Sequence, residues 1–78
     1  MTLKETGKSA EFLGVVQRCE GEVFFDTPSG DHLNLKSELS QLVFTVIINK
    51  LEGLDYSITF GEEDRIMLSG YLEERNGA

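Results

Sequence analysis

One stretch of the chain limits the possible folds more than any other: the apolar run from Leu42 to Ile48 and the serine ahead of it. Ser37 stands just before residues with helical periodicity. A serine there is a typical helix N-cap, because its hydroxyl accepts a hydrogen bond from a free backbone N–H. Apolar residues then recur at i, i+3, i+4, i+7 and i+8: Leu39, Leu42, Val43, Val46 and Ile47. This spacing predicts a helix from Ser37 to about Lys50, with those residues on one face.

The same run carries a second apolar stripe, formed by Phe44, Ile48 and Leu51. The helix therefore has more apolar surface than one buried face requires. The excess belongs either to the core, which we favour, or to a surface offered to a partner. A buried strand over residues 42–48 is the alternative, since this run is rich in strand-forming residues and periodicity alone does not separate the two structures.

The segments ahead of this helix predict a first helix and a β-hairpin. The first helix begins at Thr6 or Ser9 and ends near Arg18. One face of it carries Phe12, Leu13, Val16 and Cys19 at helical spacing. A strand over residues 22–26 follows, then the turn 27–30, in which Pro28 and Gly30 suit the turn backbone. The returning strand, 31–35, alternates between apolar and polar residues.

The rest of the chain predicts a third strand and a last helix. The strand runs from Leu54 to Phe60, and Gly61 ends it. The acidic run 62–64 reads as the solvated first turn of a helix that has Arg75 in its last turn and residues 76–78 as a tail. Residues 1–5 are either a short first strand or a disordered leader. The order (β)αββαβα predicts one α+β domain over 1–78, with an antiparallel sheet and helices on one face.

Composition argues against several classes of function. The net charge of −7 opposes nucleic acid and anionic membranes as partners, because binding to phosphate is supplied by Lys and Arg. One cysteine and one histidine, Cys19 and His32, allow neither an intramolecular disulfide nor a Cys/His metal framework. We expect Cys19 to be buried and His32 to be exposed on the hairpin. No run approaches the ~20 apolar residues of a membrane span, and we expect a cytoplasmic protein.

Four segments resemble the HPr family, the histidine-containing phosphocarrier proteins of the sugar phosphotransferase system. They are Ala10-Glu11-Phe12-Leu13, the hairpin Gly21–Leu35, the step Leu35-Lys36-Ser37, and the segment 57–64 that leads into the last helix. The resemblance implies an open-faced β-sandwich, in which three helices cover one side of a four-stranded antiparallel sheet.

Of the family's two functional sites, this chain matches one and lacks the other. Its phosphoryl-carrying histidine begins the first helix, where this chain has Glu5-Thr6-Gly7-Lys8 and no imidazole to act as the nucleophile. His32 lies in the hairpin and does not replace it. In some bacteria a kinase phosphorylates a serine at the start of the second helix, and Ser37 matches that position. The resemblance thus implies a degenerate member that is not a working carrier.

We therefore predict a regulatory or adaptor protein that is not an enzyme, needs no cofactor or metal, and binds protein partners such as phosphotransferase-system or regulatory proteins. Binding is expected through the start of the first helix and through the second helix, with Ser37 as a phosphoacceptor and, as partner-binding residues, Thr6, Lys8, Lys36, Leu39 and Phe44. The alternative is an interaction domain that forms a homodimer through its apolar second helix, with no phosphotransferase role.

Overall fold

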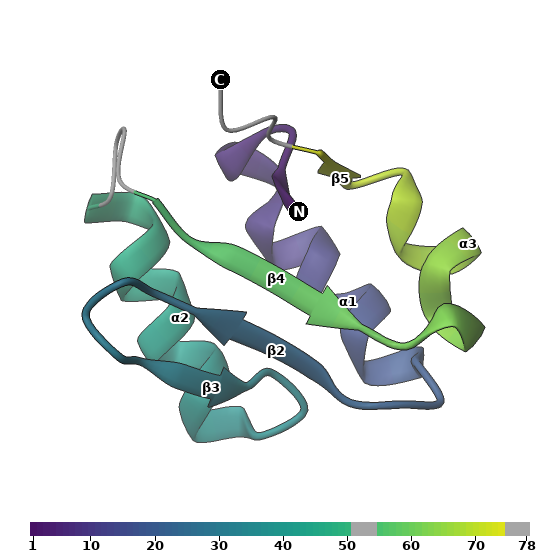
Figure 1. Cartoon of the computed structure of the whole chain (residues 1–78), viewed down its shortest axis with the longest axis horizontal. Helices are drawn as coiled ribbons and strands as arrows, with labels where there is room; N and C mark the ends of the chain where they lie inside the picture. The colour runs from purple at the N-terminus through teal and green to yellow at the C-terminus, as the bar shows by residue number, and fades with distance from the viewer. Residues whose placement is uncertain (51–54, 75–78) are drawn as a thin grey trace.

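The computed structural model describes residues 1–50 and 55–74 and shows a small α+β protein (Figure 1). Within these ranges three α-helices and five short strands follow one another, and the strand pairs are antiparallel. The predicted class and strand direction are therefore confirmed. The predicted placements of Leu51, Leu54, Arg75 and residues 76–78 lie outside the described residues.

The central sheet has three strands in the order β3-β2-β4, which are His32–Asn34, Val23–Asp26 and Ser57–Phe60. β2 lies in the middle, where Phe25 pairs with Leu33 on one side and with Ile58 on the other. Successive side chains of a strand point to opposite faces, and Val23 and Phe25 accordingly both point into the core. The predicted inward face of this strand is confirmed.

The hairpin between β2 and β3 forms as predicted. The N–H of Thr27 donates to the carbonyl of Asp31 at 3.0 Å, and the N–H of Gly30 donates to the carbonyl of Thr27 at 3.1 Å. Gly30 has a φ of +100°, a conformation that favours glycine because it has no Cβ. Pairing continues just past β3, where the N–H of Leu35 donates to the carbonyl of Val23 at 2.7 Å.

The end of the chain departs from the prediction. A short 3-10 helix η2 (Glu62–Asp64) leads into α3, which spans only Arg65–Ser69. The N–H of Tyr71 closes a turn onto the carbonyl of Leu68 at 3.0 Å, and the chain then extends as β5 (Leu72–Glu73). The predicted helix is therefore wrong beyond Ser69, because a strand pairing made there replaces further helical turns.

That pairing is with β1 (Thr2–Leu3), so the first residues form a short strand and not a disordered leader. Leu3 lies opposite Leu72, and both side chains are buried. β1 is also held beside β4: the N–H of Ile58 donates to the carbonyl of Met1 at 2.8 Å, and the N–H of Leu3 donates to the hydroxyl of Tyr56 at 3.0 Å. The chain start thus joins the small sheet to the central one.

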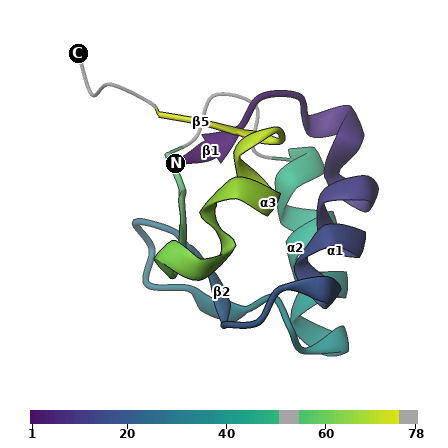
Figure 2. The ribbon, with the colours of Figure 1, turned by 90° about the vertical axis from the view of Figure 1, so that its right-hand side faces the viewer.

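The first two helices cover one side of the strands (Figure 2). The 3-10 helix η1 (Thr6–Lys8) leads into α1 (Ser9–Arg18), and α2 spans Glu38–Lys50. The run 42–48 lies wholly inside α2, so the predicted helix is confirmed and the strand alternative is wrong.

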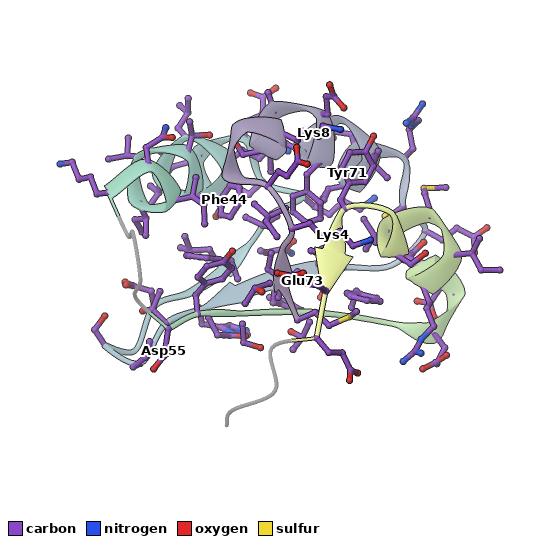
Figure 3. The ribbon with its side chains drawn as sticks, turned by 90° about the horizontal axis from the view of Figure 1, so that it is seen from above. Lys4, Lys8, Phe44, Asp55, Tyr71 and Glu73 are labelled. Atoms are coloured by element: carbon purple, nitrogen blue, oxygen red, sulfur yellow. The ribbon has the colours of Figure 1, made fainter. Side chains whose placement is uncertain are left out.

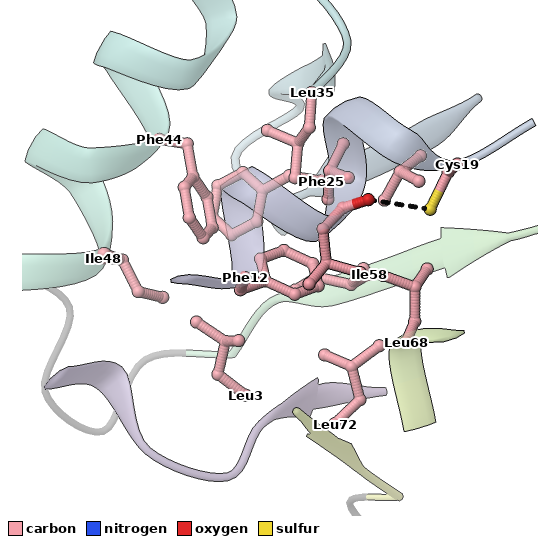
Figure 4. Packing of buried hydrophobic residues seen from close by; sticks show 13 residues of the cluster. Leu3, Phe12, Cys19, Phe25, Leu35, Phe44, Ile48, Ile58, Leu68 and Leu72 are labelled. Atoms are coloured by element: carbon pink, nitrogen blue, oxygen red, sulfur yellow. Dashed lines mark hydrogen bonds between the residues drawn. The ribbon is translucent and has the colours of Figure 1, made fainter. Parts of the chain in front are cut away.

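Three phenylalanines, Phe12, Phe25 and Phe44, fill the space between the helices and the sheet, and all three are fully buried (Figure 4). The ring of Phe44 meets Phe25 edge-on at 4.9 Å between centroids and lies 6.2 Å from Phe12. Such tilted and edge-to-face pairs add about 0.5–1.5 kcal/mol each beyond the burial of their area. The core thus ties α1, β2 and α2 to one another.

Candidate functional site

The outer face of α2 carries the most prominent exposed apolar surface of the described chain. We call it the outer stripe, formed by Leu39, Leu42, Val43 and Val46, which are 71%, 67%, 39% and 55% exposed. Their i, i+3, i+4, i+7 spacing places them in one row along two turns of the helix. An exposed row of four apolar side chains is typical of a surface that binds another protein.

The stripe that the sequence marks as the buried face is therefore mostly the exposed one. Only Ile47 of the five predicted residues packs against the core, as a partly buried side chain. The stripe marked as excess does the packing, since Phe44 and Ile48 are 0% and 3% exposed. The prediction that the excess stripe belongs to the core is confirmed for these two residues, but the prediction that Phe44 binds a partner is wrong, because its side chain is fully buried.

Ser37 lies exposed directly ahead of Glu38, the first residue of α2. Its carbonyl accepts the first helical hydrogen bond, from the N–H of Gln41 at 3.0 Å. Within residues 1–50 and 55–74, however, its hydroxyl makes no hydrogen bond, so the predicted side-chain cap is not formed. The start of the helix is instead held by Gln41, whose side-chain amide donates to the carbonyl of Leu35 at 2.8 Å.

Lys36, predicted to meet a partner, is partly buried and bound within the chain. Its ammonium donates to the carbonyl of Cys19, the residue that follows α1. This hydrogen bond fastens the start of α2 to the end of α1. Lys36 therefore has a structural role here. Sequence patterns do not reveal it, because the contact joins residues 17 positions apart.

Cys19 is buried, as predicted, and its Sγ lies 3.5 Å from the carbonyl of Val15. Burial raises the pKa of its thiol, and the neighbouring Asp64 carboxylate raises it further, against smaller opposing effects of Lys36 and Arg18. A raised pKa keeps the thiol protonated at neutral pH, where it is a weak nucleophile.

Asp64 corrects the expectation that the acidic run 62–64 is solvated. Its side chain is 1% exposed, and its two carboxylate oxygens accept the N–H groups of Glu20 and Gly21 at 2.9 Å each. Glu62 and Glu63 are exposed, as predicted. The carboxylate of Asp64 thus ties the connection between α1 and β2 to η2, and the sequence gives no signal for this contact across more than 40 residues.

The start of α1 borders a cavity of about 330 Å³ lined by Lys4, Glu5, Lys8, Glu11, Gly70 and Tyr71. Figure 3 shows Lys4, Lys8 and Tyr71 close together there. The Nζ of Lys8 lies 3.9 Å from the Oε2 of Glu5, as an exposed ion pair. Thr6 is the first residue of the short helix η1, which ends at Lys8. Two lysines and two glutamates leave this cavity without a dominant charge.

The predicted binding residues do not form one patch. Lys36 contacts the end of α1, while Thr6 and Lys8 precede its start, and ten helical residues span about 15 Å. Phe44 is in the core, so Leu39 alone contributes to the outer stripe. Of the predicted partner-binding residues, the structure thus places one on the strongest exposed apolar surface.

His32 is exposed on the hairpin, as predicted, but it is not isolated. Its Nδ1 contacts the carboxylate of Asp26, and its ring stacks on Phe24 with 4.5 Å between centroids. The described residues include no group of three or more His, Cys, Asp or Glu side chains placed to hold a metal ion. None of the described helices combines the length and apolar character needed to cross a bilayer.

Comparisons with protein-family models, with curated proteins and with solved structures find no match to this chain. The outer stripe of α2, the exposed Ser37 and the cavity at the start of α1 are therefore interpreted from their own geometry.

Proposed function

We propose that this protein is a regulatory or adaptor domain that acts by binding another protein through the outer stripe of α2. The exposure of Leu39, Leu42 and Val46, each more than half exposed, is the observation that carries the proposal. Burying such side chains against a partner contributes about 25 cal/mol per Å² of apolar area removed from water. The opposite face of α2 already supplies the core, so a partner can cover the stripe without disturbing the fold.

We further propose that the domain is HPr-like and that phosphorylation of Ser37 controls this binding. The alternation of helices and antiparallel strands supports the family assignment. The exposed hydroxyl at the start of α2 supports the phosphorylation, because free N–H groups and the helix dipole both favour negative charge at that end. Phosphate there adds about −1.5 to −2 charge two residues from Leu39, and so changes what the stripe accepts.

The phosphorylation is tested by intact mass after two incubations. One uses ATP and the serine kinase of the HPr family, and the other uses phosphoenolpyruvate and the first enzyme of the phosphotransferase system. We expect one phosphate from ATP and none from phosphoenolpyruvate, since the start of α1 lacks a histidine. Ser37→Ala removes the phosphate and Ser40→Ala retains it. Absence of any ATP-dependent phosphate on the wild-type chain contradicts this part of the proposal.

The binding surface is tested by a photo-crosslinking amino acid placed at Val46 on α2. A matched probe at Thr59, exposed on β4, is the control. We expect crosslinked protein products from Val46 in cells, and few from Thr59. Equal crosslinking at the two sites contradicts the outer stripe as a binding surface.

A further inference from the structure

The two ends of α2 carry opposite charges next to the outer stripe. Glu38 lies in the first turn and Lys50 in the last, and both side chains are exposed. Neither forms an ion pair with any residue in the described part of the chain. The helix therefore offers an apolar row with an exposed acid at one end and an exposed base at the other.

This arrangement is complementary to itself when one copy is turned end for end. A two-fold axis between Leu42 and Val43 brings Leu39 of one copy opposite Val46 of the second, and the row buries itself. Glu38 and the Lys50 of the second copy then lie within about one helical turn, a gap that their long side chains span. A two-fold axis makes each such contact twice.

We propose that the outer stripe binds a second copy of this chain, with the two α2 helices packed antiparallel. Antiparallel packing places the start of each helix beside the end of the other. The opposite partial charges of the two helix dipoles then lie side by side, which is favourable, and the two Glu38–Lys50 pairs can form. A parallel pair would instead bring Glu38 against Glu38 and Lys50 against Lys50. The i, i+3, i+4, i+7 spacing is also that of the seam between two helices in a coiled coil.

The dimer is expected to be weak and concentration-dependent. Two helical turns bury less than the ~800 Å² per partner of a standard interface. Each copy has a net charge of −7, and this repulsion also opposes association at low salt. The second copy is thus the partner that binds the outer stripe, which rests on the proposed function of that stripe as a protein-binding surface.

Sedimentation equilibrium of the full chain, from about 1 μM to about 1 mM in about 150 mM salt, tests the dimer directly. We expect the mass to rise from 8.7 kDa toward twice that value. Val46→Glu should raise the dissociation constant about tenfold or more, because each dimer loses two valine contacts and gains two carboxylates in an apolar seam. Ile66→Glu is the matched control, on α3 and 91% exposed, and should have no effect.

A charge exchange tests the antiparallel orientation. Glu38→Lys should weaken the dimer by about threefold to tenfold, because two attractive pairs become repulsive. The double variant Glu38→Lys with Lys50→Glu should recover most of the loss, since the pairs re-form with reversed sign. Circular dichroism confirms that these surface variants remain folded.

Three outcomes overturn the inference: a wild-type chain that stays monomeric at the highest concentration, a dimer that Val46→Glu does not weaken, or a dimer that Glu38→Lys leaves unchanged. A monomeric chain that still crosslinks from Val46 to proteins of other masses would remove the second copy as partner and leave the proposed function standing. A chain that neither dimerises nor crosslinks from Val46 removes both.

Discussion

The inner and outer faces of α2 are both apolar, yet they have opposite surroundings. Phe44 and Ile48 lie on the inner face and are buried against the sheet and α1, whereas the leucines and valines of the outer stripe are mostly in solvent. The two faces differ in shape more than in hydrophobicity. On the inner face, the large ring of Phe44 fills the space between α1 and β2. The smaller side chains of the outer stripe would fill this space less completely. Apolar character therefore serves packing on one side of this helix and a binding surface on the other.

The largest expected effect comes from shortening one residue on each face. Phe44→Ala should lower the free energy of unfolding by about 3–5 kcal/mol, because it leaves a cavity among the rings of Phe12 and Phe25. Leu42→Ala, on the outer stripe, should change it by no more than about 0.5 kcal/mol. Urea unfolding followed by circular dichroism measures both. Equal losses for the two variants would mean that the outer stripe also stabilises the single chain.

The acidic residues Asp64 and Glu62 show the same contrast between a buried and an exposed side chain, with smaller expected effects on stability. Asp64→Asn should lower the free energy of unfolding by about 1–3 kcal/mol, because an amide accepts only one of the two N–H groups that the carboxylate binds. Glu62→Gln, nearby and exposed, should have an effect within about 0.5 kcal/mol. The same urea titration compares them. A neutral Asp64→Asn would show that water replaces the lost hydrogen bond.

The sequence was sufficient where the pattern is local. The hairpin depends on Pro28 and Gly30 and on alternation within ten residues, and the structure has it in place. The sequence also located the two apolar stripes of α2. Its assignment of the outer stripe to the buried face was wrong, because helical periodicity alone does not show which face of α2 packs against Phe12 and Phe25.

The errors at the chain ends have the same origin. Leu72 fits the spacing of the last helix as well as it fits a strand. Its pairing opposite Leu3 decides the outcome, and that contact joins residues almost the whole chain apart. The hydrogen bonds of Asp64 and Lys36 are equally non-local. Sequence periodicity reports on neighbours along the chain and carries no information about such partners.

The buried thiol of Cys19 should make the stability of the folded chain depend on pH. The pKa of the Cys19 thiol is raised in the folded state, chiefly by burial, so the folded chain keeps this proton longer than the unfolded one. The stabilisation is complete below the unfolded pKa of about 8.5 and is lost as the pH rises through the higher folded value. Stability of the wild-type chain should therefore fall above that pH more steeply than stability of Cys19→Ala. Parallel curves for the two proteins, from urea midpoints at a series of pH values, would contradict this.

The smallest expected effect on the free energy of unfolding is at the two exposed ends of α2, where substitutions act through charge and not through packing. Ser37→Asp should raise the free energy of unfolding by about 0.3–1 kcal/mol, because a carboxylate beside the free N–H groups interacts favourably with the helix dipole. Asn49→Asp places the same charge in the last turn and should lower it by a similar amount, partly through loss of the hydrogen bond from Asn49 to the carbonyl of Thr45. Thermal unfolding at low and high salt measures both, and salt should reduce both effects. If Ser37→Asp instead destabilises the chain, the start of α2 does not favour added negative charge, and a phosphate at Ser37 would act by loosening the helix under the outer stripe.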